Sequence, residues 1–350
     1  MAIIMKPGWL YFLRDRDFRT GKVSKYVKIG KTDYDRPVAS RLSEHQTGNP
    51  REVYSVHEMQ VSSIDTVETH LHHLLASHGV HGEWFELDDS QVQQSIDEAK
   101  KLEKTLKEII SAAEAVEVLK TTYSNGKTRD ATPDEKNLLN ELIEAKKEHI
   151  VAAAITKFHN EKIRRLMGNN EGIKDVAEYQ VKTTAATMDS KKVKELHPSL
   201  VAKYTSLIAK FGSDFKAEFT NPQLRALDGS LNDAIAKEKD KQVGSNDPTN
   251  YSGGEAGRTP DIENAHLDYV ASLAEASRLE IKIEMLIIKI KAAIGEFDIV
   301  EGLGKWIRQD KETEKIDWPK FKEENPKIVS ANMKPEIHRM AMKVKPFRPY

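Results

Sequence analysis

Five residues in the first quarter of the chain have the side-chain types that phosphodiester hydrolysis requires. Attack on a phosphate needs a cation on the non-bridging oxygens, a group that positions or deprotonates water, and an acid or metal for the leaving oxygen. Arg41 supplies a fork-shaped cation for phosphate, and Glu68 supplies the hard oxygen ligand that Mg²⁺ prefers. The candidates for proton transfer are Tyr11, Lys28 and His45. The set predicts a metal-dependent phosphodiesterase.

Two strands and two helices must hold these side chains together. The segments GWLYFLR and VKIGKT read as strands and would present Tyr11 and Lys28. A helix after them would place Arg41 and His45 one turn apart on one face, because residues four apart are neighbours on a helix. A later helix holds Glu68, and the closing strand is GEWFEL, whose aromatic pair is expected in the core. The sequence thus predicts a small three-layer α/β domain.

Residues 8–88 resemble the GIY-YIG endonuclease superfamily, and more closely its phage-T5-type branch, in which the second signature is KIG and the domain closes on EWF. In this resemblance, Tyr11 ends the first signature and Lys28 begins the second. The catalytic arginine, the histidine one turn later and the metal-binding glutamate are matched by Arg41, His45 and Glu68. The resemblance implies that the tyrosine positions or deprotonates the attacking water, that DNA is the substrate, and that Mg²⁺ or Mn²⁺ is the cofactor.

The chain departs from the superfamily pattern at three places. Lys28 replaces the second tyrosine, Trp9 stands where the first signature usually has glycine, and the segment from Lys31 to Ser40 is longer than in the homing enzymes. A non-catalytic nucleic-acid-binding or scaffold protein that retains the fold is therefore the alternative interpretation. Because all the catalytic residue types except the second tyrosine are present and in order, the sequence favours the enzyme.

Charge is unevenly distributed along this domain. Residues 1–51 contain eleven Lys and Arg against five Asp and Glu, whereas residues 52–90 contain eight acidic residues and no Lys or Arg. The whole chain has a net charge of −1, so contact with a phosphate backbone requires a local basic surface. The candidates for that surface are Lys22, Lys25, Lys31, Arg36 and Arg51.

An apolar seam with heptad-like spacing follows the α/β domain. Between Gln91 and Thr122, apolar residues three and four apart run from Ala99 to Val116. A turn-forming stretch then ends the seam, and Pro133 begins a second helix that reaches about Met167. The pattern favours a helical hairpin or a short dimeric coiled coil, which would make a homo-oligomer through residues 91–167. A helical spacer that packs on itself is the alternative.

The rest of the chain contains an internal repeat. MDSKKVKELHP, which begins at Met188, matches IDWPKFKEENP, which begins at Ile316, 128 residues later. Each copy predicts a long helix ended by Gly168 or Gly295, a strand, a short basic helix capped by aspartate, and a last strand. We therefore expect two α+β modules, which bind DNA or a partner protein.

The end of the second copy is basic and contains aromatic residues. Residues 332–350 include five Lys and Arg against one acid, and we take Lys343, Lys345 and Arg348 as DNA-binding candidates, with an ordinary solvated terminus as the alternative. A short segment of this copy resembles the tail of phage-type YqaJ exonucleases. The expected domains are a nuclease-like domain at 1–90, a helical spacer at 91–132, modules at 133–242 and 262–350, and a flexible linker at 243–261.

Composition limits the class of protein further. The chain has no cysteine, which excludes disulfides, thiolate catalysis and cysteine-ligated zinc, and suits a cytoplasmic protein. No apolar run reaches the length of a membrane span, so we expect no membrane partner. These features predict an α+β multidomain DNA endonuclease, in a phage or anti-phage setting.

Overall fold

The computed structural model describes residues 3–219, 229–240 and 254–345. It contains both helices and several sheets, so the mixed α+β class expected from the sequence is confirmed. Within the described ranges, no helix has the length and apolar character needed to cross a membrane. Arg348 and residues 243–253 of the expected linker lie outside the described residues.

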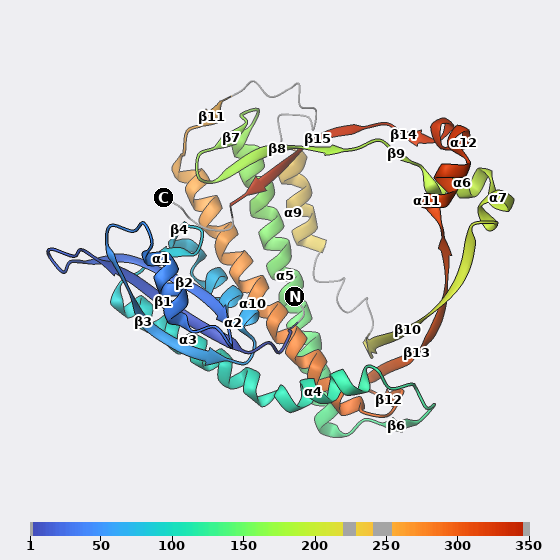
Figure 1. The fold of residues 1–350 in the computed structure, drawn as a ribbon, viewed down its shortest axis with the longest axis horizontal. Helices are drawn as coiled ribbons and strands as arrows, with labels where there is room; N and C mark the ends of the chain where they lie inside the picture. The colour runs from blue at the N-terminus through green and yellow to red at the C-terminus, as the bar shows by residue number, and fades with distance from the viewer. Residues whose placement is uncertain (1–2, 220–228, 241–253, 346–350) are drawn as a thin grey trace.

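An antiparallel sheet of five strands, in the order β3-β1-β2-β5-β4, forms the centre of the N-terminal domain (Figure 1). Successive side chains of a strand point to opposite faces. Leu10 and Phe12 of β1 therefore face one side of the sheet, whereas Tyr11 and Leu13 face the other. All four are fully buried, because β1 lies between two strands and both faces are covered. The strands are β1 (Gly8–Arg16), β2 (Val23–Asp33), β3 (Glu52–Val61), β4 (Gly79–His81) and β5 (Trp84–Glu86).

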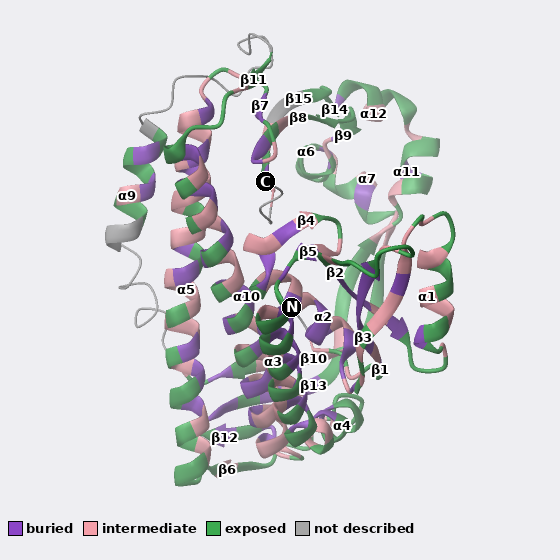
Figure 2. Cartoon of the chain, turned by 90° about the vertical axis from the view of Figure 1, so that its left-hand side faces the viewer, coloured by how far each residue is buried: buried purple, intermediate pink, exposed green. Residues whose placement is uncertain are grey.

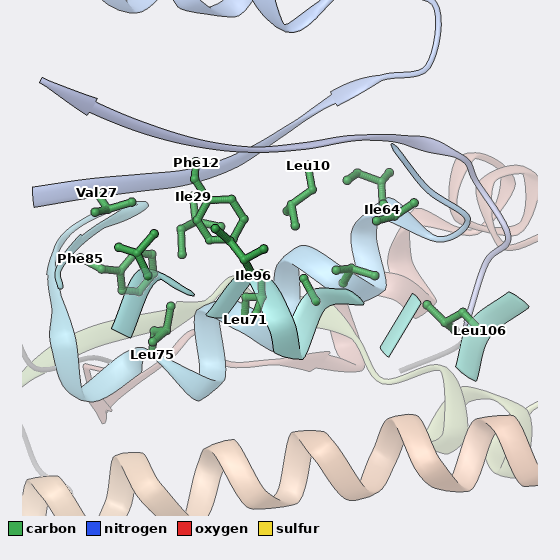
Figure 3. Close-up of a cluster of buried hydrophobic side chains, with 14 of the residues drawn as sticks. Leu10, Phe12, Val27, Ile29, Ile64, Leu71, Leu75, Phe85, Ile96 and Leu106 are labelled. Carbon is green, nitrogen blue, oxygen red and sulfur yellow. The ribbon is translucent and has the colours of Figure 1, made fainter. Parts of the chain in front are cut away.

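Helices cover the two faces of this sheet. Helix α1 (Val38–Gln46) packs on the Tyr11 side and lies at the margin of the molecule in Figure 2, with exposed positions along its outer side. Helices α2 (Ile64–Leu74) and α3 (Asp89–Glu108) pack on the other side, around Phe12 (Figure 3). The short 3₁₀ helix η1 (Ala76–His78) leads from α2 into β4. We call the face beneath α1 the site face.

The apolar seam after the sheet is buried inside this chain. It runs along α3 and α4 (Ile110–Leu119), and Ala99, Leu106 and Ile109 are fully buried. These residues belong to the core that the sheet and α2 build. The dimeric coiled coil expected of this seam therefore does not form at residues 99–109, because the core of the sheet already covers them, and Val116 at the end of the seam packs in a second cluster with Leu139 and Leu142.

The long helix that starts at Pro133 pairs with a distant helix instead of with α3 or α4. Helices α5 (Pro133–Met167) and α10 (Pro260–Ile294) lie side by side (Figure 1). Thr156 donates a hydrogen bond to Ser272 at 3.0 Å, and His149 lies 3.5 Å from Glu280. Since one residue number rises as the other falls, the pair is antiparallel. A further helix, α9 (Gly229–Asp240), packs on α5.

The two copies of the internal repeat have similar helix ends and helix caps. Gly168 and Gly295 end the two long helices with φ of 58° and 61°, a backbone conformation that favours glycine. Asp189 and Asp317 cap two short helices by accepting a backbone hydrogen bond. The first copy contains β6 (Thr128–Asp130), β7 (Gly172–Ile173), β8 (Ala177–Thr184), β9 (Thr187–Met188), α6 (Ser190–Leu196), α7 (Pro198–Ala202) and β10 (Thr205–Ala217). The second contains β11 (Glu255–Ala256), β12 (Ile299–Glu301), β13 (Gly304–Ile316), α11 (Trp318–Glu324), α12 (Pro326–Ala331), β14 (Met333–Lys334) and β15 (Ile337–Val344).

The two copies exchange strands. One sheet has the order β10-β13-β12-β6 and the other β11-β7-β8-β15, so each contains two strands from each copy. The short helices also exchange contacts: the Asp317 N–H donates to the Tyr204 carbonyl at 2.9 Å, and the Asp189 N–H donates to the Asn332 carbonyl at 2.8 Å. The copies are therefore consecutive in sequence but intertwined in space.

Candidate active site

Tyr11 lies directly over a glycine of the neighbouring strand. Residue Tyr11 of β1 is paired with Gly30 of β2, and Leu13 is paired with Lys28, so Tyr11 and Lys28 share the site face. A Cβ atom added at Gly30 would lie 2.6 Å from the Tyr11 hydroxyl oxygen and 2.7 Å from Cζ. No other residue type at position 30 leaves room for the Tyr11 ring in this place.

Helix α1 brings two more of the expected residues to the same face. Arg41 and His45 lie one turn apart on α1, and the rings of His45 and Tyr11 have their centroids 6.4 Å apart. The Tyr11 hydroxyl is buried, makes no well-formed hydrogen bond among the described residues, and lies close to the Arg41 guanidinium. Burial raises the pKa of Tyr11, and the nearby Arg41 guanidinium offsets this only in part. Tyr11 is therefore a neutral phenol at physiological pH.

His45 is neutral at the same pH. Burial lowers the pKa of His45, and the positive charges of Lys28 and Arg41 lower it further. Its Nε2 atom is buried without a hydrogen-bond partner among the described residues. An uncharged imidazole with a free nitrogen can accept a proton, so the geometry suits a general base.

Lys28 is engaged by a carboxylate that the sequence analysis did not select. Its ammonium group, on a side chain that is 9% exposed, forms an ion pair with Glu83. Burial tends to raise the pKa of Glu83, but the hydrogen bond from Lys28 and the charges of Lys28, His72 and Arg41 outweigh it and lower that pKa. Glu83 belongs to the GEWFEL segment, immediately before Trp84, so its place in a motif was the signal that could have found it.

Glu68 approaches from the opposite helical layer. It lies on α2 and is 6% exposed. One carboxylate oxygen, Oε2, is 2.7 Å from the ammonium nitrogen of Lys31, which also contacts Asp65 at 2.5 Å. The other, Oε1, is buried and has no hydrogen-bond partner among the described residues. The Glu68 charge lies near enough to Tyr11 to raise the pKa of that phenol.

Four of the five expected catalytic residues thus have an unpartnered buried polar atom. These atoms are Tyr11 Oη, Arg41 Nε, His45 Nε2 and Glu68 Oε1. An unsatisfied buried polar group costs about 1–3 kcal/mol, so proteins usually pair such atoms. Other such atoms occur among the described residues, one of them Thr32 Oγ1 on β2, but this group combines donors and acceptors around one strand pair. The arrangement fits a ligand that is itself polar and charged.

The donor set limits how a metal ion could be held. In the described ranges, no group of three or more His, Asp or Glu side chains is arranged to hold a metal ion. A single buried carboxylate oxygen, Oε1 of Glu68, is available. Mg²⁺ keeps several water molecules and often takes only one or two carboxylates, so this residue fits it, whereas zinc needs more protein ligands.

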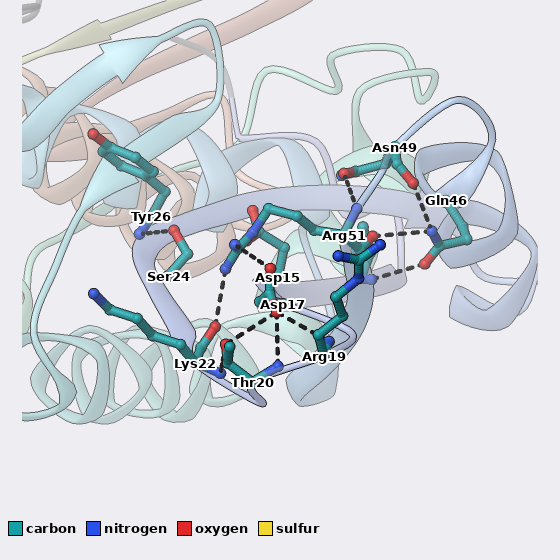
Figure 4. A network of polar contacts seen from close by, with 11 residues as sticks. Asp15, Asp17, Arg19, Thr20, Lys22, Ser24, Tyr26, Gln46, Asn49 and Arg51 are labelled. Carbon is teal, nitrogen blue, oxygen red and sulfur yellow. Dashed lines mark hydrogen bonds and ion pairs between the residues drawn. The ribbon is translucent and has the colours of Figure 1, made fainter.

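Most of the expected DNA-facing cations of this domain have acidic partners within the chain. Lys25 contacts Glu86 at 2.5 Å, and Arg36 contacts Glu44. Figure 4 shows Arg51 against Asp15 and the Lys22 carbonyl oxygen, where it ties the β1–β2 hairpin to β3. Contact with phosphate would require exchange of these partners. The residues with such partners are Lys25, Lys31, Arg36 and Arg51, whereas the side chain of Lys22 is exposed.

The C-terminal candidates lie at a different part of the molecule. Lys343 is exposed on β15, and Lys345 contacts Asp175 at 3.4 Å. These residues belong to the sheet with β8, not to the site face of the N-terminal domain. They can contribute to binding of a large ligand but not to chemistry at Tyr11.

The candidate site lies within a range of the chain that matches a known family model. The model of the T5orf172 domain matches residues 8–110, a range that begins with β1 and ends at the start of α4. This family is associated with phage and with GIY-YIG-like nuclease domains. The chain matches no curated protein and no solved structure. Residues 8–110 are therefore similar to the T5orf172 domain.

Proposed function

We propose that this chain is a metal-dependent DNA endonuclease of the GIY-YIG type. The observation that supports it is the group of unpartnered buried polar atoms of Tyr11, Arg41, His45 and Glu68. A phosphodiester with its attacking water has the donors, acceptors and negative charge to satisfy them. The similarity of residues 8–110 to the T5orf172 domain supports the same proposal and favours a phage or anti-phage setting.

Arg41 binds the scissile phosphate in this proposal. One of its terminal nitrogens now contacts Glu44 at 2.6 Å, and Glu44 also contacts Arg36. Because this carboxylate is about half exposed, its ion pairs are screened by water and weak. A phosphate can replace the carboxylate and accept two parallel hydrogen bonds from the guanidinium.

Tyr11 and His45 handle the attacking water. The Tyr11 phenol is protonated at neutral pH, since burial raises its pKa, so it orients the water through a hydrogen bond. The neutral imidazole of His45 accepts the proton that the water loses as its oxygen forms a bond to phosphorus. Lys28 stays paired with Glu83, and its positive charge helps to keep His45 neutral.

Glu68 would hold Mg²⁺ or Mn²⁺ through Oε1. When bound, such an ion supplies a positive charge for the leaving oxygen. Lys31 contacts the other oxygen of Glu68 and keeps the carboxylate in place on α2.

The alternative function is a non-catalytic nucleic-acid-binding or scaffold protein. The contacts Arg41–Glu44 and Lys31–Glu68 favour it, because each neutralises a charge that the reaction requires. Both proteins would bind DNA, and only the enzyme would break it.

Nicking of supercoiled plasmid DNA, with and without Mg²⁺, separates the two functions. We expect cleavage that EDTA stops, that Glu68→Gln abolishes, and that Arg41→Lys slows by a factor equivalent to about 2–4 kcal/mol, as for other transition-state donors. Glu114→Gln is the control, since Glu114 is exposed on α4, away from the site face. Equal nicking by wild type and Glu68→Gln would contradict the proposal.

A further inference from the structure

Two long β-ribbons extend away from the helix pair. In Figure 1 the ribbons β10–β13 and β8–β15 leave opposite ends of α5 and α10 and meet near the short helices. Thirteen residue pairs link β10 to β13, which corresponds to a length of about 40 Å. Leu207 is 67% exposed and Val181 is 56% exposed, so the outer parts of both ribbons are open to solvent.

The two faces of the β10–β13 ribbon differ in charge. Side chains alternate between faces along each strand, and the register defines which residues share a face. One face has three acidic residues, Asp310, Glu312 and Glu314, whereas its single cation, Arg308, is fully buried. The other face, which we call the basic face, has five lysines and one acid, Asp214. These lysines are Lys210, Lys216, Lys305, Lys311 and Lys315.

Lysines on the basic face are directly opposed across the ribbon. Lys210 is paired with Lys311, and Lys216 is paired with Lys305. Side chains in such positions have Cβ atoms about 4.5–5.5 Å apart, and like charges there repel. Lys311 contacts Asp214. Lys210, Lys216 and Lys305 are exposed, and no ion pair neutralises them among the described residues. The ribbon therefore has an excess positive charge that a polyanion would relieve.

The second ribbon also has lysines on one face. In the register of β8 with β15, Lys182 and Lys343 occupy the same face. The acid of that face is Glu178, paired with Lys343. Each ribbon pairs one strand of the first copy with one strand of the second, so the two ribbons are equivalent parts of the repeat.

We propose that the basic faces of the two ribbons bind the phosphate backbone of double-stranded DNA. The proposal rests on the proposed nuclease function and names the surface that holds its substrate. A two-stranded ribbon fits the major groove of a duplex, and about 40 Å of ribbon matches one helical turn of about 34–36 Å. DNA offers one negative charge per roughly 1.7 Å of its axis, which is dense enough to neutralise opposed lysines.

Anisotropy of a labelled duplex of about four helical turns, measured with the full chain in EDTA over a range of salt concentrations, tests this surface. Lys210→Gln with Lys311→Gln removes two phosphate contacts, so the slope of log affinity against log salt should shrink by about 1.8 and affinity should fall by on the order of 10- to 30-fold. The double variant Lys216→Gln with Lys305→Gln should show the same reduction in salt slope and in affinity. Lys104→Gln with Lys157→Gln, exposed positions on α3 and α5, is the matched control.

Thermal unfolding shows whether a variant lost binding because it lost its fold. Removal of opposed like charges relieves repulsion, so the Tm of the ribbon variants should equal or exceed that of wild type. Unchanged salt slope and affinity in both ribbon variants would overturn the proposal, as would an equal loss in the control. Tighter binding of an RNA duplex of the same length would overturn the assignment to DNA.

The surface and the nuclease function can fail separately. If the ribbon variants lose DNA affinity but wild type shows no Mg²⁺-dependent nicking, the nuclease function is wrong and the ribbon surface stands. If wild type nicks DNA and the ribbon variants bind and nick as wild type does, the ribbon surface is wrong and the nuclease function stands.

Discussion

Replacement of Gly30 by alanine tests whether the Tyr11 hydroxyl is part of the reaction centre. The added Cβ atom would lie 2.6 Å from Oη, 2.7 Å from Cζ and 2.8 Å from Cε2 of Tyr11. Carbon atoms in contact prefer about 3.5–4.0 Å, so the ring has to move by about 1 Å. The ring is fully buried beneath α1, and His45 lies beyond it, so it has no free space to enter.

The size of the effect follows from this displacement. A misplacement of about 1 Å at a reacting group can cost on the order of 100-fold in rate. Overpacking of a closed core costs about 1–3 kcal/mol of the free energy of unfolding. We therefore expect Gly30→Ala to nick plasmid DNA about 100-fold more slowly than wild type, while urea unfolding shows a folded protein of reduced stability.

A double-mutant cycle with Tyr11→Phe identifies the cause. If the alanine acts by moving the Tyr11 hydroxyl, it should slow Tyr11→Phe much less than it slows wild type. Single-turnover nicking rates of the four proteins, under conditions where urea unfolding shows each to be folded, supply the cycle. A folded Gly30→Ala variant with a nicking rate within about twofold of wild type would refute the role of Tyr11, because the displaced hydroxyl would then have no effect on the rate.

Three further predictions concern ionisable groups. Because burial and the charges of Lys28 and Arg41 lower the pKa of His45, nicking should be independent of pH above 6.5 and fall as pH drops through that lowered pKa; His45→Gln should remove this acidic limb. Glu83→Gln should cost about 1 kcal/mol in unfolding free energy, because Lys28 loses its anionic partner; the cost is small because water screens the half-exposed Glu83. Since the pKa of Glu83 is lowered, wild type has this stability above pH 4.5 and loses it as the pH falls. Hydrogen bonds from Arg129 lower the pKa of Glu135 to about 2, so Glu135→Gln should cost up to about 3 kcal/mol at neutral pH, a contribution that wild type loses between pH 4.5 and 2.

Each of these has a measurement that can contradict it. An acidic limb retained in His45→Gln would assign the proton acceptor elsewhere. For the two glutamates, urea unfolding at several pH values is compared with Glu58→Gln, whose side chain is exposed on β3. A difference between wild type and variant that does not shrink in acid would show that the carboxylate charge is not the source of stability.

The sequence alone determined the local features of this protein. The apolar run of β1, the one-turn spacing of Arg41 and His45, and the capping aspartates are set by residues close together in the chain. Local spacing is enough for such features, because a strand repeats every two residues and a helix every three to four. The same rules found both copies of the repeat.

Tertiary structure decided which partners these elements took. The seam on α3 looks the same whether a sheet or another helix covers it, so its burial in the N-terminal domain was not visible in the sequence. The pairing of α5 with α10, and of β10 with β13, joins residues more than 90 positions apart along most of their length. The hydrophobic effect is non-directional, so an apolar pattern shows that a face is buried but does not identify the element that covers it.

The candidate site also combines features that the sequence determined with features that only the tertiary structure decided. Residue types and order indicated Tyr11, Arg41, His45 and Glu68, because the chemistry requires those groups wherever the chain places them. The pairing of Lys28 with Glu83 depended on the approach of the β4–β5 turn to β2, which brings together residues 55 positions apart. The charges that set the pKa of His45 likewise come from two elements, β2 and its own helix, and only the packed structure brings them close enough to act.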